Sequence, residues 1–139
     1  MLRPIRLFFS YSHKDEHLRD ELEAHLSVLK HQGIISGWHD RRISPGASWS
    51  EEINANLEAS QIILMLVSAD FLASEYCYKI EMLQALRKHD ANEAIAIPVL
   101  IRPVDWSGSP LAELQAVPRD AKPVTSWANR DDAWVSSAS

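Results

Sequence analysis

One carboxylate stands among apolar neighbours in the segment 74–88. The residues around Glu81 are Tyr76, Cys77, Ile80, Met82 and Leu83. A helix that is apolar on most sides is largely buried, and an ionised carboxylate is costly to bury without a partner or a task. Glu81 is therefore the first candidate for chemistry. A carboxylate near a helix start also interacts well with the helix dipole or caps free amides, so the spacing alone leaves a structural role open.

Apolar runs alternate with helical spacing along most of the chain. Strands are predicted at 5–10, 34–39, 62–67 and 94–101, and helices at 18–29, 48–57 and 74–88. Strands that alternate with helices pair in parallel. The pattern predicts an α/β fold: a flavodoxin-like parallel sheet of order 2-1-3-4-5 with helices on both faces.

The last third of the chain is less regular, because four prolines interrupt residues 102–123. We expect an irregular loop with a short helix there, and a short edge strand at 122–125, where proline is tolerated. Acidic residues begin a final helix near Asp131. A helix this brief is marginal alone. We therefore expect residues 1–139 to be a single domain excised from a longer multidomain protein.

Composition restricts the class of protein. The chain has 139 residues, enough for one domain that buries roughly 70% of the surface of its unfolded form. Its 14 basic and 19 acidic residues give a net charge of −5, which argues against a direct nucleic-acid partner. It contains no apolar run of the ~20 residues that span a bilayer and no signal peptide. With Cys77 as the one cysteine, these features predict a cytoplasmic protein without a membrane partner.

The predicted topology also indicates where a ligand would bind. In open parallel sheets ligands bind beyond the carboxyl ends of the strands, where the strand order reverses. That point lies between the first and third strands. The segments 10–13 and 68–74 follow these two strands, and the loop 40–48 is expected at the same edge. Their convergence favours a functional role for Glu81.

Several familiar chemistries do not fit the residues. The four glycines are too scattered for a phosphate-binding loop. His13 and His17 flank Glu16, but their order is not that of a His-Glu-x-x-His metalloprotease, so no metal site is expected. Ser10 and Ser12 lie beside His13, yet adjacent residues rarely form a nucleophile and its base.

An ordered set of motifs resembles a TIR (Toll/interleukin receptor) domain of the bacterial type. The set comprises Phe8-Phe-Ser-Tyr-Ser12 with Asp15, Trp38-His-Asp40, Pro45-Gly46, Ser74-x-Tyr76-Cys77 ahead of Glu81, Val99-Leu-Ile-Arg-Pro103 and the region of Trp127. The resemblance covers nearly the whole chain. It implies the flavodoxin-like sheet and one of two functions: a scaffold that acts through TIR–TIR contacts, or an enzyme that cleaves NAD+ at the nicotinamide–ribose bond.

The resemblance also implies a set of site residues. Glu81 corresponds to the catalytic glutamate of the enzymatic members. The family usually has Trp four and Cys three residues before it, whereas Cys77 stands four before it here and Tyr78 three before it. Carried over by position, the residues that line the substrate cleft are Ser10, Tyr11, Ser12, His13, Asp40, Gly46, Trp49, Tyr76 and Cys77. Trp49 would stack on a ring of the substrate, or pack in the core instead.

The implied enzyme is an NAD+ nucleosidase of bacterial immune signalling that is activated by self-association. It would need no cofactor, since NAD+ is its substrate, and it would release nicotinamide with ADP-ribose or a cyclic isomer. One carboxylate suffices because nicotinamide leaves as a neutral molecule, so no general acid is required, unlike ordinary glycosidases. The carboxylate would stabilise the developing positive charge, and activity should fall at acidic pH, where it is protonated.

Two other functions remain open from the sequence. In an interaction module, the loop 40–48 would dock onto a neighbouring copy and Glu81 would be structural. A nucleoside deoxyribosyltransferase-like enzyme would act on free nucleosides.

Overall fold

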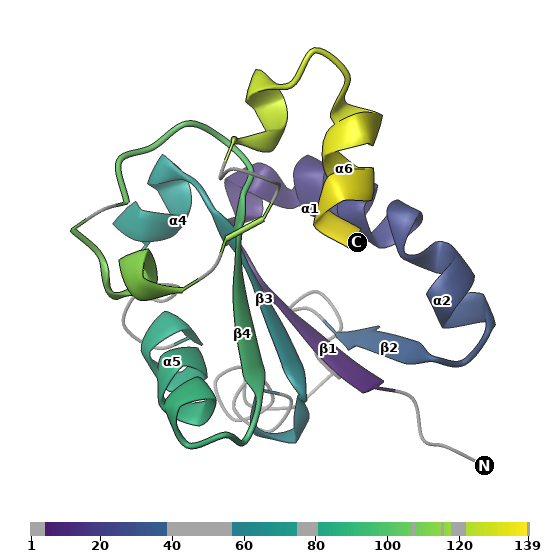
Figure 1. Ribbon diagram of the computed structural model, residues 1–139, viewed down its shortest axis with the longest axis vertical. Helices are drawn as coiled ribbons and strands as arrows, with labels where there is room; N and C mark the ends of the chain where they lie inside the picture. Colours follow the sequence, from purple (N-terminus) through teal and green to yellow (C-terminus); the bar gives the residue numbers. More distant parts are fainter. Residues whose placement is uncertain are drawn as a thin grey trace.

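The computed structural model describes residues 5–38, 57–74, 81–106, 108–114, 116–117 and 122–138. Within them, a sheet of four parallel strands has the order β2-β1-β3-β4 (Figure 1). The strands are β1 (Ile5–Ser10), β2 (Ile35–Trp38), β3 (Ile62–Val67) and β4 (Ile95–Leu100). The predicted α/β, flavodoxin-like fold is confirmed, and β1 lies next to β3 as the predicted order requires.

Side chains alternate between two cores, one on each face of the sheet, because successive residues of a strand point to opposite sides. Phe8 of β1 lies in the first core, with Ile63 and Met65 of β3. Leu7 and Phe9 lie in the second. Both faces are covered, which explains why the central strands read as continuous apolar runs.

Different helices cover the two faces of the sheet (Figure 1). The helices α1 (Glu16–His25), α2 (Ser27–His31) and α6 (Arg130–Ala138) lie on the side of the second core. The first core is covered by α4 (Ala69–Ala73), α5 (Leu83–Asp90), the 3₁₀ helix η4 (Pro110–Glu113) and the helical residues 57–59. The predicted single helix over 18–29 is two helices, because the backbone leaves helical geometry at Leu26.

The edge of the sheet beyond β4 differs from the prediction. Residues 122–125 do not form a strand; Val124–Ser126 is a 3₁₀ helix, η6. Pro123 has no N–H to donate to a strand ladder, and the turn that follows buries Val124 completely. Among the described residues beyond β4, Val117 forms an isolated bridge with Val99. The short helix expected within 102–123 is present as η4.

The final helix, α6, obtains its stability from packing. Asn129 caps it, accepting hydrogen bonds from the backbone N–H of Asp131 at 2.8 Å and of Asp132 at 3.3 Å. Trp134 is fully buried in the second core, and its Nε1–H donates to Glu21 Oε1 of α1 at 2.9 Å. Such contacts stabilise a helix that is too short to persist alone. Among the described residues, no helix has the length and apolar character needed to cross a bilayer.

Candidate active site

Glu81 meets Ser10 at the carboxyl end of β1. The Ser10 hydroxyl donates a hydrogen bond of 2.8 Å to Glu81 Oε1, across 71 residues of sequence. The exposed fraction is 4% for Glu81 and 0% for Ser10. A buried carboxylate needs such a donor to offset its lost hydration. The segment 74–88 thus does bury its carboxylate, at the β1–β3 switch point.

The helix that carries Glu81 is amphipathic rather than apolar on most sides. Glu81 and Met82 have π-helical geometry and lead into α5. Residues at positions 81, 85 and 88 are buried, as helical spacing requires of one face. Leu83 is 44% exposed, so the expectation of a helix buried on most sides is wrong there. Lys88 Nζ donates to the backbone oxygen of Glu58 at 2.8 Å and so anchors α5.

The loop after β1 carries the other described site residues. Ser12 caps the 3₁₀ helix η1 (His13–Asp15), because its Oγ accepts from the Lys14 N–H at 3.3 Å. His13 is exposed, and its ring lies 6.2 Å from that of Tyr11. Tyr11 is buried in the second core, on the opposite face from Ser10. Of the four predicted loop residues, Ser10 is hydrogen-bonded to Glu81.

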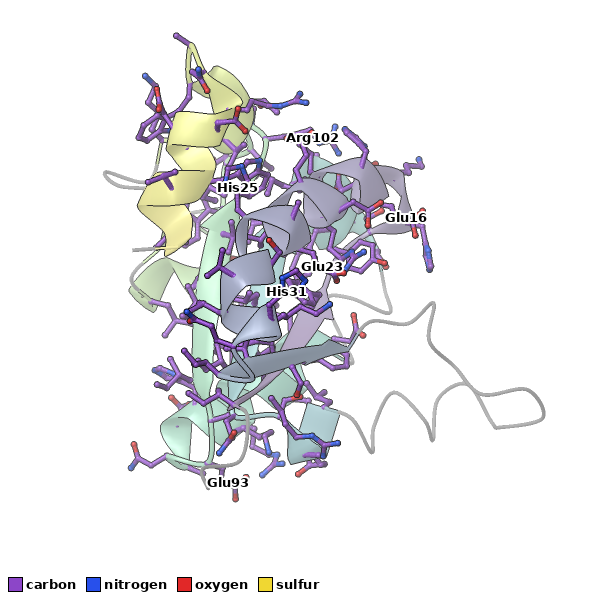
Figure 2. The ribbon with its side chains drawn as sticks, turned by 90° about the vertical axis from the view of Figure 1, so that its right-hand side faces the viewer. Glu16, Glu23, His25, His31, Glu93 and Arg102 are labelled. Atoms are coloured by element: carbon purple, nitrogen blue, oxygen red, sulfur yellow. The ribbon has the colours of Figure 1, made fainter. Side chains whose placement is uncertain are left out.

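A buried arginine fixes Tyr11, and sequence reasoning missed it. Arg19 of α1 is 2% exposed, and its guanidinium lies 5.4 Å from the ring centre of Phe9 and 5.9 Å from that of Tyr11. It also pairs with Asp20 and Glu23. Glu23 lines an open depression of about 390 Å³ together with His31 of α2, and both are labelled in Figure 2. Acidic residues one and four positions after Arg19 were the available signal.

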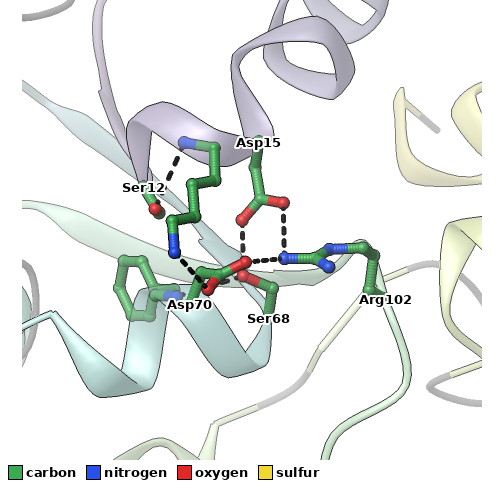
Figure 3. Close-up of polar contacts among 7 residues, drawn as sticks. Ser12, Asp15, Ser68, Asp70 and Arg102 are labelled. Carbon is green, nitrogen blue, oxygen red and sulfur yellow. Dashed lines mark hydrogen bonds and ion pairs between the residues drawn. The ribbon is translucent and has the colours of Figure 1, made fainter.

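A second polar group joins the carboxyl ends of β1, β3 and β4 (Figure 3). Asp15 is fully buried; its Oδ2 accepts from the Ser68 hydroxyl at 2.5 Å, and its Oδ1 lies 2.8 Å from Arg102 Nη2. The same nitrogen donates to Asp70 Oδ2 at 2.5 Å, and Lys14 Nζ lies 3.7 Å from Asp70 Oδ1. The hydrogen bond from Arg102 holds the pKa of Asp70 below its ordinary value of 3.8, and that bond raises the pKa of Arg102.

This low pKa predicts acid sensitivity. Asp70 binds a proton more weakly in the folded chain than in the unfolded one, so its contribution to stability is present above pH 4 and lost as the pH falls through its folded pKa. We expect the free energy of unfolding to decrease below about pH 4, and to decrease less in Asp70→Asn. Urea unfolding at several pH values measures this. Identical pH profiles for the two proteins would contradict the assignment.

A second prediction concerns the contribution of the Ser10–Glu81 hydrogen bond to stability. Ser10→Ala removes a hydrogen bond to a buried carboxylate, which should lower the free energy of unfolding by about 1.5–3 kcal/mol. Ser10→Thr keeps the hydroxyl and should recover part of the loss. Denaturant unfolding near neutral pH compares the three proteins, and an alanine variant as stable as the wild type would show that the bond is not formed in solution.

Five predicted site residues lie outside the described residues and remain predictions: Asp40, Gly46, Trp49, Tyr76 and Cys77. The loop 40–48 is outside them as well. In the part of the chain that the structure describes, no group of three or more His, Cys, Asp or Glu side chains is placed to hold a metal ion.

Comparison with known proteins identifies relatives of the chain. Residues 7–136 match the family model of the TIR domain. The uncharacterized protein y4lF of Sinorhizobium fredii (strain NBRC 101917 / NGR234) is 53% identical over 129 residues, which cover 93% of this chain and 40% of that protein. The chain thus spans less than half the length of this curated relative.

Solved structures agree with this match. The TIR domain of the Toll-related receptor TRR-2 from Hydra magnipapillata superposes with a TM-score of 0.63 at 21% identity, covering 80% of this chain and 81% of that one. The TIR domains of the activated Roq1 resistosome, which directly recognizes the pathogen effector XopQ, give a TM-score of 0.55 at 26% identity. That match covers 68% of this chain and 56% of the resistosome chain. The family match and the parallel sheet together establish that this chain belongs to the TIR domain family, as its motifs predict.

Proposed function

We propose that the chain is an NAD+ hydrolase that cleaves the nicotinamide–ribose bond. The observation that carries the proposal is the buried Glu81 carboxylate, hydrogen-bonded to Ser10 at 2.8 Å. It lies at the carboxyl end of β1, beside β3, where open parallel sheets bind their ligands. A carboxylate buried at such a point is more often functional than one on an open surface.

One carboxylate is enough for this reaction. The bond between the ribose carbon and the pyridinium nitrogen breaks with both electrons going to nitrogen, so nicotinamide leaves neutral and needs no proton. Positive charge develops on the sugar, where the Glu81 carboxylate stabilises it. Water then attacks to give ADP-ribose and a proton, or a nucleophile of the same molecule attacks to give a cyclic isomer. In this mechanism Ser10 orients Glu81 through its hydrogen bond.

Activation by self-association completes the proposal. The similarity to the TIR domains of a resistosome supports a role in immune signalling, in which copies of this domain are brought together. We propose that the enzyme acts in the bacterial cytoplasm, where NAD+ is available, and that it needs no cofactor beyond this substrate.

Chromatography of the reaction products tests the proposal. The purified chain is incubated with NAD+, first at high concentration and then crowded on beads, and nicotinamide, ADP-ribose and cyclic products are quantified. Nicotinamide release that increases on crowding supports an enzyme activated by assembly. Turnover of free nucleosides in place of NAD+ would instead indicate a deoxyribosyltransferase-like enzyme. No turnover in either format would leave an interaction scaffold as the function.

A further inference from the structure

We propose that Arg102, on the loop after β4, is a positioning residue for the candidate active site. It acts through a cluster of three residues, Asp15, Ser68 and Arg102, here called the edge clamp (Figure 3). The inference rests on the proposed function, because it assigns a role in the reaction of Glu81. Arg102 itself contacts Asp15 and Asp70, so its role in the site is to hold other residues in place.

The edge clamp ties together the carboxyl ends of three adjacent strands. Asp15 ends η1, which follows β1; Ser68 directly follows β3; Arg102 follows β4 by two residues. A single side chain, Asp15, contacts both of the others, at 2.5 Å to Ser68 and 2.8 Å to Arg102. The Ser68 hydroxyl also accepts from the Phe71 N–H at 3.1 Å, which starts α4. Movement of one loop would therefore break contacts with the other two.

The burial of Asp15 and Ser68 strengthens the contacts of the edge clamp. Asp15 and Ser68 are both 0% exposed, so the Asp15 charge cannot be rehydrated while the chain stays folded. An unpaired buried charge is strongly unfavourable, and Arg102 supplies the opposite charge. Charges in the surrounding group are balanced, since Lys14 and Arg102 face Asp15 and Asp70. A balanced group of this kind is suited to holding loops together rather than to binding a free ion.

The edge clamp holds the loop that follows Ser10 and the residue that caps a helix preceding Glu81 in the chain. Ser10 ends β1, and the same loop continues to the clamped Asp15. On the other side, Ser68 caps α4, a helix that precedes Glu81 in the chain. Arg102, at the end of a third strand, is thus linked through Asp15 to the loop after β1 and to Ser68 after β3. Displacements of about 1 Å at a reacting group reduce rates roughly a hundredfold, so such a brace affects turnover directly.

The experiment compares Arg102→Met and Arg102→Lys with a matched control, Arg130→Met. Arg130 is a half-exposed arginine as well, but it lies on α6 and pairs with Glu21 of α1, at 2.6 Å. Amide hydrogen exchange is followed at Asp15 and Phe71, whose N–H groups bond to Ser12 and Ser68. The Ile101 amide, bonded to Val67, reports the body of the sheet. The kcat and KM for NAD+ are measured on the same samples.

We expect Arg102→Met to speed exchange at Asp15 and Phe71 about tenfold, with Ile101 unchanged, because the opening is local. The kcat should fall roughly tenfold to a hundredfold with KM little changed. Arg102→Lys keeps the charge but loses the planar fork, so it should be intermediate, and Arg130→Met should match the wild type. If Arg102→Met does not fold, Arg102→Lys decides alone.

Two results would overturn the inference. One is exchange at Asp15 and Phe71 that is no faster in the Arg102 variants than in Arg130→Met. The other is faster exchange with an unchanged kcat, which would make the clamp structural only. If the wild-type chain itself shows no NAD+ turnover, the proposed function fails and a catalytic positioning role fails with it, while the exchange rates still show whether the clamp holds the loops.

Discussion

Replacing Glu81 by glutamine should abolish nicotinamide release from NAD+ while the chain stays folded. Glutamine has nearly the shape of glutamate and keeps an oxygen that can accept the Ser10 hydroxyl, so the hydrogen bond of 2.8 Å has a substitute acceptor. What is lost is the negative charge that stabilises the sugar as nicotinamide departs. Removal of one well-placed electrostatic group typically costs roughly 10²–10³-fold in kcat, which should bring turnover to background.

Glu93→Gln is the matched control for this experiment. Glu93 is an exposed carboxylate at the amino end of β4, and Figure 2 labels it at the opposite end of the molecule from Arg102. We expect it to release nicotinamide at the wild-type rate. Thermal unfolding of both variants confirms that they are folded. A Glu81→Gln protein that retained more than about a tenth of the wild-type kcat would contradict a catalytic role for this carboxylate.

The strands were predictable because their local signals and their tertiary setting agree. The residues of β3 are apolar throughout, those of β1 are apolar between Arg6 and Ser10, and a serine marks the carboxyl end of each run. The segment 122–125 misled the prediction, because a short apolar-polar run beside a proline is compatible with either an edge strand or a turn. The structure shows Val117 meeting β4 through a bridge to Val99. The break at Leu26 likewise has no signal in the leucine spacing.

The sequence predicted where in the sheet the site lies, but not which side chains are hydrogen-bonded there. The switch-point rule brings the loop after β1 towards Glu81, and that is where Ser10 lies. Which side chain donates to Glu81 depends on packing between residues far apart in the chain. The spacing of apolar residues carries no information about such contacts. Buried charges were missed for a related reason: Asp15 and Arg19 occur in polar stretches that resemble an exposed helix face. Their burial follows from contacts with Ser68, Arg102 and aromatic rings.

Trp134→Ala should lower the free energy of unfolding by about 3–5 kcal/mol, the usual cost of removing a buried aromatic side chain. Trp134 is 0% exposed and joins α6 to α1, so truncation leaves a cavity and removes the hydrogen bond of 2.9 Å to Glu21. α6 is short and has little stability of its own, so the loss should also raise amide exchange throughout it.

Two further substitutions separate the causes of this loss. Trp134→Phe keeps most of the apolar volume but not the N–H, so it should cost less than the alanine variant, with about 1 kcal/mol of its loss due to the hydrogen bond. Trp127, which is partly buried and donates to the Lys122 backbone oxygen at 2.9 Å, is the matched control, and its alanine variant should lose less than Trp134→Ala. Equilibrium urea unfolding of the set measures these differences. A loss below about 1 kcal/mol for Trp134→Ala would mean that α6 is not packed on α1 in solution. A large loss would show that α6 is an integral part of the domain, although it packs on the face of the sheet opposite to Glu81.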